Sequence, residues 1–179
     1  MNKLRFLSTF LLVFALLLVV WNRTGSSRWY TRGFLAVAAV MGPSMHGWVM
    51  ERHPGGHRAP VWVRGDKRVR TAIQFDALSI AVLPALALLA ATPGLGVRRR
   101  ARLMLLAAAL CFLIDSIIVA LFPLLVFYKN PFTDVIGTFL GVVAFVGAPV
   151  LVWGVLTFRD LQRFLPALRR HQPRLPVRP

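Results

Sequence analysis

Asp115 is the residue whose type and position point most directly to chemistry. It lies near the middle of an apolar run from residue 104 to 128 and is followed by Ser116. A carboxylate at that depth is costly in a bilayer, and such residues face the interior of a helix bundle or belong to a functional site. The sequence shows no basic residue at the same depth. Asp115 and Ser116 are therefore candidate intramembrane polar residues, either in a functional site or in a hydrogen bond to a neighbouring helix.

A second set of polar residues falls at one predicted membrane level. Gln74 and Asp76 open one apolar run, Asp134 precedes another, and Arg64 lies in a polar segment predicted to sit beside them. Interfacial anchoring and helix capping explain any one of these residues alone. As a group, Arg64, Gln74, Asp76 and Asp134 are candidates for binding a partner or a substrate.

The other reactive residue types form no catalytic or metal-binding pattern. Cys111 lies in an apolar run, where a thiol is inert. Because it is the only cysteine, the chain can form neither an internal disulfide nor a CxxC motif. His53 and His57 are four residues apart, but Pro54-Gly55-Gly56 prevents the helix that would align them. We therefore expect no catalytic residue, no metal and no cofactor, and we do not expect an enzyme.

Apolar helices would have to position these residues. Membrane spans are predicted at about residues 6–21, 72–92, 104–128 and 135–158. The last three reach the roughly 20 residues that a bilayer requires. The first follows Lys3 and Arg5, as in a secretory signal, but no small-x-small cleavage motif follows it, so an uncleaved span is favoured.

Two further segments separate the first and second spans. Residues 33–50 are apolar but interrupted by Gly42-Pro43-Ser44, which favours an interfacial or re-entrant helix, with a fifth span as the alternative. Residues 60–71 alternate apolar and basic side chains around Gly65-Asp66-Lys67, a pattern that predicts a β-hairpin. A lone hairpin is marginally stable in water, so this one should rest on helices, lipid or a partner.

The last span and the tail complete the chain. Gly137 and Gly141 form a GxxxG pattern that permits close helix packing. Residues 159–179 begin as an amphipathic segment and end in Pro and Arg, which predicts a basic, partly disordered tail. Residues 1–158 are expected to form a single transmembrane domain.

The composition agrees with a membrane protein. The chain is 57% hydrophobic, with a mean hydropathy of +0.65. Lys and Arg number 22 against 6 Asp and Glu, for a net charge of +16. So basic a chain can bind nucleic acid, but here the charges lie between and beyond the apolar runs. They predict membrane topology and contacts with lipid headgroups, and no nucleic-acid partner is expected.

The charge distribution also predicts the orientation. Four arginines precede the 104–128 span, whereas Lys129 is the one basic residue in the loop after it. Short basic loops stay in the cytoplasm, whereas the rule weakens for a long loop such as the one that carries the basic hairpin. Both termini and the tail should therefore lie inside and the hairpin outside. The predicted fold is an all-α membrane protein: a bundle of about four transmembrane helices with a short extracytoplasmic β-hairpin and an interfacial helix.

Part of the chain resembles a known family. The chain resembles exosortase H-associated membrane proteins in two stretches, Gln74-Phe75-Asp76-Ala77-Leu78 and the run from Leu83 to Pro93. It also resembles them in the order of its segments: one span, a broken apolar segment, a hairpin and three spans. The likeness extends to about Phe158. Exosortases themselves open the corresponding helix with a catalytic Cys, and this chain has Gln74-Phe75-Asp76 there.

The resemblance implies a multi-pass protein of a Gram-negative bacterial inner membrane, a non-catalytic accessory of an exosortase-type protein-sorting system. Its expected partners are membrane lipids and an exosortase or its sorted substrate. No functional residues carry over, because none are defined for the family. The alternatives are a small membrane enzyme or lipid-binding protein that uses the outer polar cluster, and an ion-pathway subunit built around Asp115.

Overall fold

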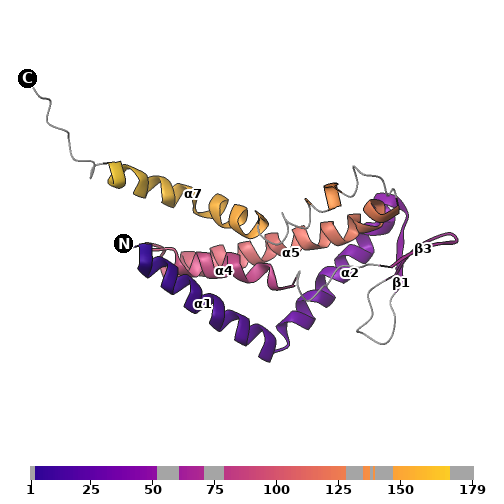
Figure 1. Cartoon of the computed structure of the whole chain (residues 1–179), viewed down its shortest axis with the longest axis horizontal. Helices are drawn as coiled ribbons and strands as arrows, with labels where there is room; N and C mark the ends of the chain where they lie inside the picture. Colours follow the sequence, from indigo (N-terminus) through magenta and orange to yellow (C-terminus); the bar gives the residue numbers. More distant parts are fainter. Residues whose placement is uncertain are drawn as a thin grey trace, which may run out of the picture.

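The computed structural model describes residues 3–51, 61–70, 79–127, 135–137, 139 and 147–169. Helices make up most of this part, and a small antiparallel sheet lies at one end (Figure 1). The elements are α1 (Lys3–Arg23), α2 (Ser26–His46), β1 (Val49–Glu51), β2 (Val61–Arg64), β3 (Lys67–Arg70), α4 (Val82–Ala91), α5 (Val97–Phe127) and α7 (Ala148–Arg169). These elements confirm the prediction of a mainly helical fold with a short β-hairpin.

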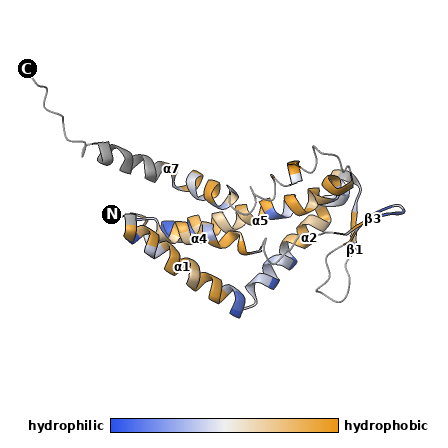
Figure 2. Ribbon diagram, in the orientation of Figure 1, coloured by the Kyte–Doolittle hydropathy of each residue, from blue (hydrophilic) through white to orange (hydrophobic). Residues whose placement is uncertain are grey.

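α1 is apolar on every side. Phe14, Leu17 and Leu18 pack toward α4, and its outward face exposes Leu4, Leu7, Leu11, Leu12, Leu16, Val19 and Val20. Figure 2 shows that most of α1 is hydrophobic, up to the hydrophilic residues at its end. In the described part, two helices are long and apolar enough to cross a membrane, Leu4–Arg23 and Val97–Phe127. Two shorter apolar helices, Val82–Ala91 and Ala148–Phe158, accompany them.

α5 carries its small and polar residues on the inward face. The buried residues are Ala107, Cys111, Asp115, Ser116, Val119, Ala120 and Pro123. Leu105, Leu106 and Leu113 are exposed. Small residues at a helix contact let backbones approach closely, which is typical of helices packed in lipid. The helix begins at Val97, several residues before the predicted span, so its first turn carries the basic cluster of that loop.

α2 turns away from α1 and runs along α5 (Figure 1). The turn is made at Gly25, whose φ of 69° is a conformation that glycine adopts without strain. The helix continues through Pro43 and ends at Gly47, whose N–H donates to the Pro43 carbonyl at 3.1 Å. Pro43 lies close to the C-terminal end, so the donor it lacks does not break the helix. The 33–50 segment is thus continuous helix to His46, and its last residues enter β1.

The sheet has the order β1-β2-β3, with all neighbours antiparallel. β2 and β3 form a hairpin across Gly65 and Asp66, in which Trp62 pairs with Val69. β1 adds a third strand that the sequence did not predict, with Met50 opposite Trp62. Trp62 is fully buried against α2. The hairpin is therefore stabilised by a third strand and by packing on a helix.

Two core clusters fill the bundle. One joins the sheet to α2 and the C-terminal half of α5 through Phe34, Trp48, Trp62 and Val119, among others. The other joins α4, α5 and α7, with α1 packed against it. Tyr30 packs against both clusters. The seam between the clusters is therefore the place where α2 is fixed to the rest of the bundle.

Candidate functional site

Asp115 is buried at this seam and bonded to a residue of another helix. Its carboxyl is 2% exposed and accepts a hydrogen bond of 2.8 Å from the Tyr30 hydroxyl. Tyr30 lies one turn into α2, 85 residues away in the sequence. Ser116 is also buried, and its hydroxyl donates to the Phe112 carbonyl of its own helix at 2.7 Å. Asp115 thus joins two helices, whereas Ser116 bonds within α5.

Aromatic rings surround the Tyr30 hydroxyl. Tyr30 makes edge-to-face contacts with Trp21, Phe34 and Phe112, with ring centroids 5.5 to 5.7 Å apart. Offset and edge-to-face packing is the favourable geometry for such rings. These contacts fix the ring of Tyr30 and therefore the direction of its O–H, which points to Asp115.

Further polar atoms lie near Tyr30, on α2 and on the segments packed beside it. Ser27 and Ser79 share a hydrogen bond of 2.9 Å that links the start of α2 to the residues before α4. The Thr31 hydroxyl and the Trp21 indole N–H are buried and make no hydrogen bond in the described structure. Unpaired buried polar atoms are costly, so the seam retains capacity to bind water or another polar group.

Arg64, one of the four candidates for binding a partner or a substrate, lines a pocket at the opposite end of α2. The pocket has a volume of about 330 Å³ and is lined by Trp48, Arg64, Lys67 and Phe127. The Lys67 ammonium lies 4.2 Å from the centre of the Phe127 ring, and the rings of Trp48 and Phe127 are 5.5 Å apart. Gln74, Asp76 and Asp134 lie outside the described residues, so their place relative to Arg64 stays a prediction.

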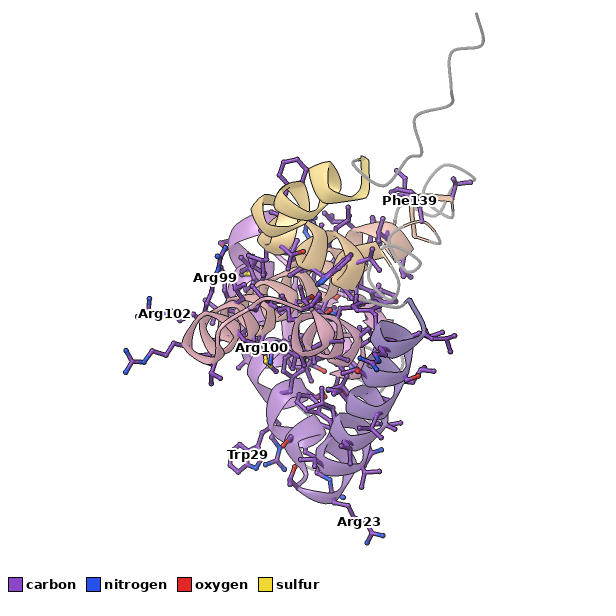
Figure 3. The ribbon with its side chains drawn as sticks, turned by 90° about the vertical axis from the view of Figure 1, so that its left-hand side faces the viewer. Arg23, Trp29, Arg99, Arg100, Arg102 and Phe139 are labelled. Carbon is purple, nitrogen blue, oxygen red and sulfur yellow. The ribbon has the colours of Figure 1, made fainter. Side chains whose placement is uncertain are left out.

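The opposite end of α5 carries a different basic group. Arg100 donates to the Thr92 carbonyl at 3.1 Å, and the Trp153 indole donates to the Thr92 hydroxyl at 2.9 Å. These bonds join the ends of α4, α5 and α7. Figure 3 shows Arg102 pointing away from the bundle while Arg100 lies against it. The cluster predicted as a topology signal therefore also contains one structural arginine.

The remaining candidates form no site among the described residues. A Cβ added at Gly137 would meet no atom within 4 Å, so no described helix packs against it, and Gly141 lies outside the described residues. Cys111 is buried one turn before Asp115. Within the described ranges, no group of three or more His, Cys, Asp or Glu side chains gathers as metal ligands would.

Sequence reasoning did not identify Tyr30 or Lys67. Tyr30 stands in a polar segment at the start of α2, and the spacing of Ser27, Tyr30, Thr31 and Phe34 is a helical face that could have been recognised. Lys67 could be paired with Arg64 only once the turn was placed at Gly65 and Asp66. Comparisons with family models, with curated proteins and with solved structures give no match to this chain.

Proposed function

We propose that this chain is a multi-pass protein of a bacterial inner membrane that binds a membrane partner through the sheet at its outer end. It is a non-catalytic accessory protein, and the resemblance described above implies an exosortase-type sorting enzyme or its substrate as the partner. The observation that carries the proposal is a small sheet held on the end of a helix bundle by a fully buried tryptophan, Trp62.

The exposed surface of the helices supports membrane insertion. α1 exposes leucine and valine along its whole length, with Leu4 at 77%, and α7 exposes Val150, Leu151, Val155 and Phe158. A contiguous apolar surface of this kind needs a partner or lipid. The beginning of α1 and the end of α7 lie toward the same end of the long axis, away from the sheet (Figure 1). That arrangement agrees with a cytoplasmic end and an outer end.

The turn between α1 and α2 supports an interfacial position for the start of α2. Arg23, Arg28 and Arg32 are exposed around it, and Figure 2 shows this apex of the molecule as hydrophilic. Trp29 is exposed beside them, with the Arg32 guanidinium 5.8 Å from its ring. Arginine and tryptophan gather at the level of lipid headgroups. α1 would then cross the membrane, and the start of α2 would lie at the level of the headgroups.

The edges of the sheet provide the contact surface. β1 and β3 are the edge strands of the sheet, and each pairs with the central strand β2 along one side. An edge strand presents backbone donors and acceptors that can pair with an extended segment of another protein. A sorting enzyme or the extended region next to a sorting helix has the chemistry to use such an edge.

A lipid-binding role is the alternative, and the cationic pocket beside Phe127 favours it. Lipid contact and partner contact differ in what they require. A partner needs the strand edges, whereas a headgroup needs the basic side chains alone.

Site-specific photocrosslinking in the native host tests the proposal. A photoreactive residue in place of Val49 on β1 or Arg68 on β3 should crosslink the tagged full-length protein to the sortase-like membrane enzyme or its substrate. The control position is Val97, which is exposed at the far end of α5. Deleting the gene for the sortase-like enzyme should remove the crosslink to that enzyme. The amount or the size of any crosslinked substrate should change, because the substrate is then no longer processed. Equal crosslinking from all three positions, or none to these proteins, would reject the proposal.

A further inference from the structure

We propose that the pocket between the β2–β3 turn and the end of α5 binds a phosphate group, presented by the headgroup of an anionic phospholipid. The inference rests on the proposed membrane insertion but not on the protein partner. It concerns Arg64 and Lys67 together with the two aromatic rings, Trp48 and Phe127, that complete the pocket.

The two cations face the same pocket because of the strand register. Arg64 and Lys67 are directly opposite each other in the antiparallel pair. They share the face of Trp62 and Val69, which point into the core, because side chains alternate along a strand. Both cations therefore lie over the ends of the helices and not on the solvent face of the sheet.

Like charges directly opposite each other on one face of a sheet are destabilising. In the described ranges, neither Arg64 nor Lys67 has a carboxylate within 4.0 Å, and the ion pair present there joins Arg68 to Glu51 on the other face. Asp66, in the turn, makes no such pair. The C-terminal end of α2 lies near Arg64, since a Cβ added at Gly47 would be 3.8 Å from its Nε. A helix end contributes only about half of one negative charge, so the described residues leave most of the positive charge uncompensated.

The chemistry of the lining selects a phosphate. Arg presents a planar fork of N–H donors that matches two phosphate oxygens, and Lys adds a point charge. The ring of Phe127 holds the Lys67 ammonium from one side and removes part of its water. The volume of about 330 Å³ is at the small end of the range for ligand pockets, which fits a headgroup better than a larger solute.

The surroundings of the pocket favour a lipid as the source of the phosphate. Val126 is exposed beside Phe127, near the C-terminal end of α5. Apolar surface thus continues from the rim of the pocket onto the helices, while the β2–β3 turn is hydrophilic (Figure 2). A phospholipid can satisfy both surfaces at once, with its phosphate between the cations and its acyl chains along the helices.

Native mass spectrometry of the full-length protein in a non-ionic detergent tests the proposal. The protein is titrated with phosphatidylglycerol, with phosphatidylcholine, and with inorganic phosphate as competitor. The wild type should retain one phosphatidylglycerol at concentrations where phosphatidylcholine is not retained. Arg64→Gln and Lys67→Gln should each weaken this retention about tenfold, the loss expected for one charge-assisted hydrogen bond.

Arg68→Gln is the matched control, because it removes the same charge from the opposite face of the same hairpin. It should keep the wild-type retention. Displacement of phosphatidylglycerol by inorganic phosphate would show that the pocket recognises the phosphate itself. Retention of phosphatidylglycerol in excess phosphate would show that the rest of the lipid adds to the affinity; both results support a headgroup site. Equal loss in Arg68→Gln, or unchanged retention in Arg64→Gln and Lys67→Gln, would overturn it. Neither outcome bears on the crosslinking test of the partner.

Discussion

At the scale of single residues, the hydrogen bond between Tyr30 and Asp115 joins α2 to α5 through a buried carboxyl. A buried carboxyl that lacks a donor is strongly unfavourable. Tyr30 supplies that donor, and its ring is held by Trp21, Phe34 and Phe112. The pair also lies where the two core clusters meet. Its first role is therefore to fix the position of α2, which carries the sheet at its other end.

Tyr30→Phe should lower the free energy of unfolding by about 1–3 kcal/mol, because it leaves the buried Asp115 carboxyl without its donor. Thermal unfolding of the purified protein in detergent measures the change. Asp115→Asn should cost less than Tyr30→Phe, because the amide oxygen can still accept from Tyr30.

The control for this experiment is Thr9→Val. The Thr9 hydroxyl bonds only the Arg5 carbonyl of its own helix, on an exposed face. A Tyr30→Phe protein as stable as Thr9→Val would show that the Tyr30–Asp115 bond does not hold the helices together.

At the scale of elements, the attachment of the sheet depends on one glycine of α2. A Cβ added at Gly42 would lie 2.8 Å from Cη2 of Trp62, closer still to Cζ3, and 3.0 Å from the Trp48 carbonyl. Real Cβ atoms do not approach so closely, and the carbonyl belongs to the backbone. The indole of Trp62 can therefore bury itself on α2 only where the helix has no side chain.

Gly42→Ala should displace Trp62 and loosen the sheet, at a cost of about 1–3 kcal/mol as for other overpacked cores. Limited proteolysis should cut the β2–β3 turn faster in the variant, and tryptophan fluorescence should shift to longer wavelength as indoles become hydrated.

Gly154→Ala is the matched control within another helix, since a Cβ there would meet no atom within 4 Å. It should leave both measurements unchanged. If Gly42→Ala behaves like Gly154→Ala, the sheet is not held by Trp62 in the way described.

At the scale of the whole molecule, basic side chains lie near both ends of α5. Arg98, Arg99 and Arg102 are exposed at the start of α5, and the sheet with its basic turn lies near the other end of that helix. At about 1.5 Å per residue, the apolar part of α5 after Arg102 is long enough to separate these groups by a bilayer. The proposed topology therefore places the two basic ends on opposite sides of the membrane.

Cysteine labelling in a Cys111→Ser background should show this orientation. A cysteine at Asp66, in the exposed turn, should react with a membrane-impermeant maleimide in intact spheroplasts, whereas one at Arg98 should react only after permeabilisation. Asp66 is preferred to Gly65, whose φ of 57° a cysteine would adopt only with strain. The reverse labelling pattern would contradict the proposed topology.

Much of the helical architecture could be read from the order of residues. The apolar runs predicted helices, and the alternation of Val61, Trp62, Val63 and Arg64 before Gly65 predicted the hairpin. Both signals are local, because burial imposes a period of 3.6 on a helix and of 2 on a strand. The burial of Asp115 was also foreseeable, since its neighbours in sequence are apolar.

Only the tertiary structure decided which residues meet. The hydrogen-bond donor to Asp115 comes from Tyr30, and the third strand of the sheet follows directly after α2. Gly42 does not break the helix; it is the position of α2 against which the ring of Trp62 packs. Arg64 was chosen from its place beside residues 74, 76 and 134, but the described structure pairs it with Lys67, Trp48 and Phe127. Periodicity fixes which face of an element is buried, whereas the partner of that face depends on how elements distant in sequence pack together.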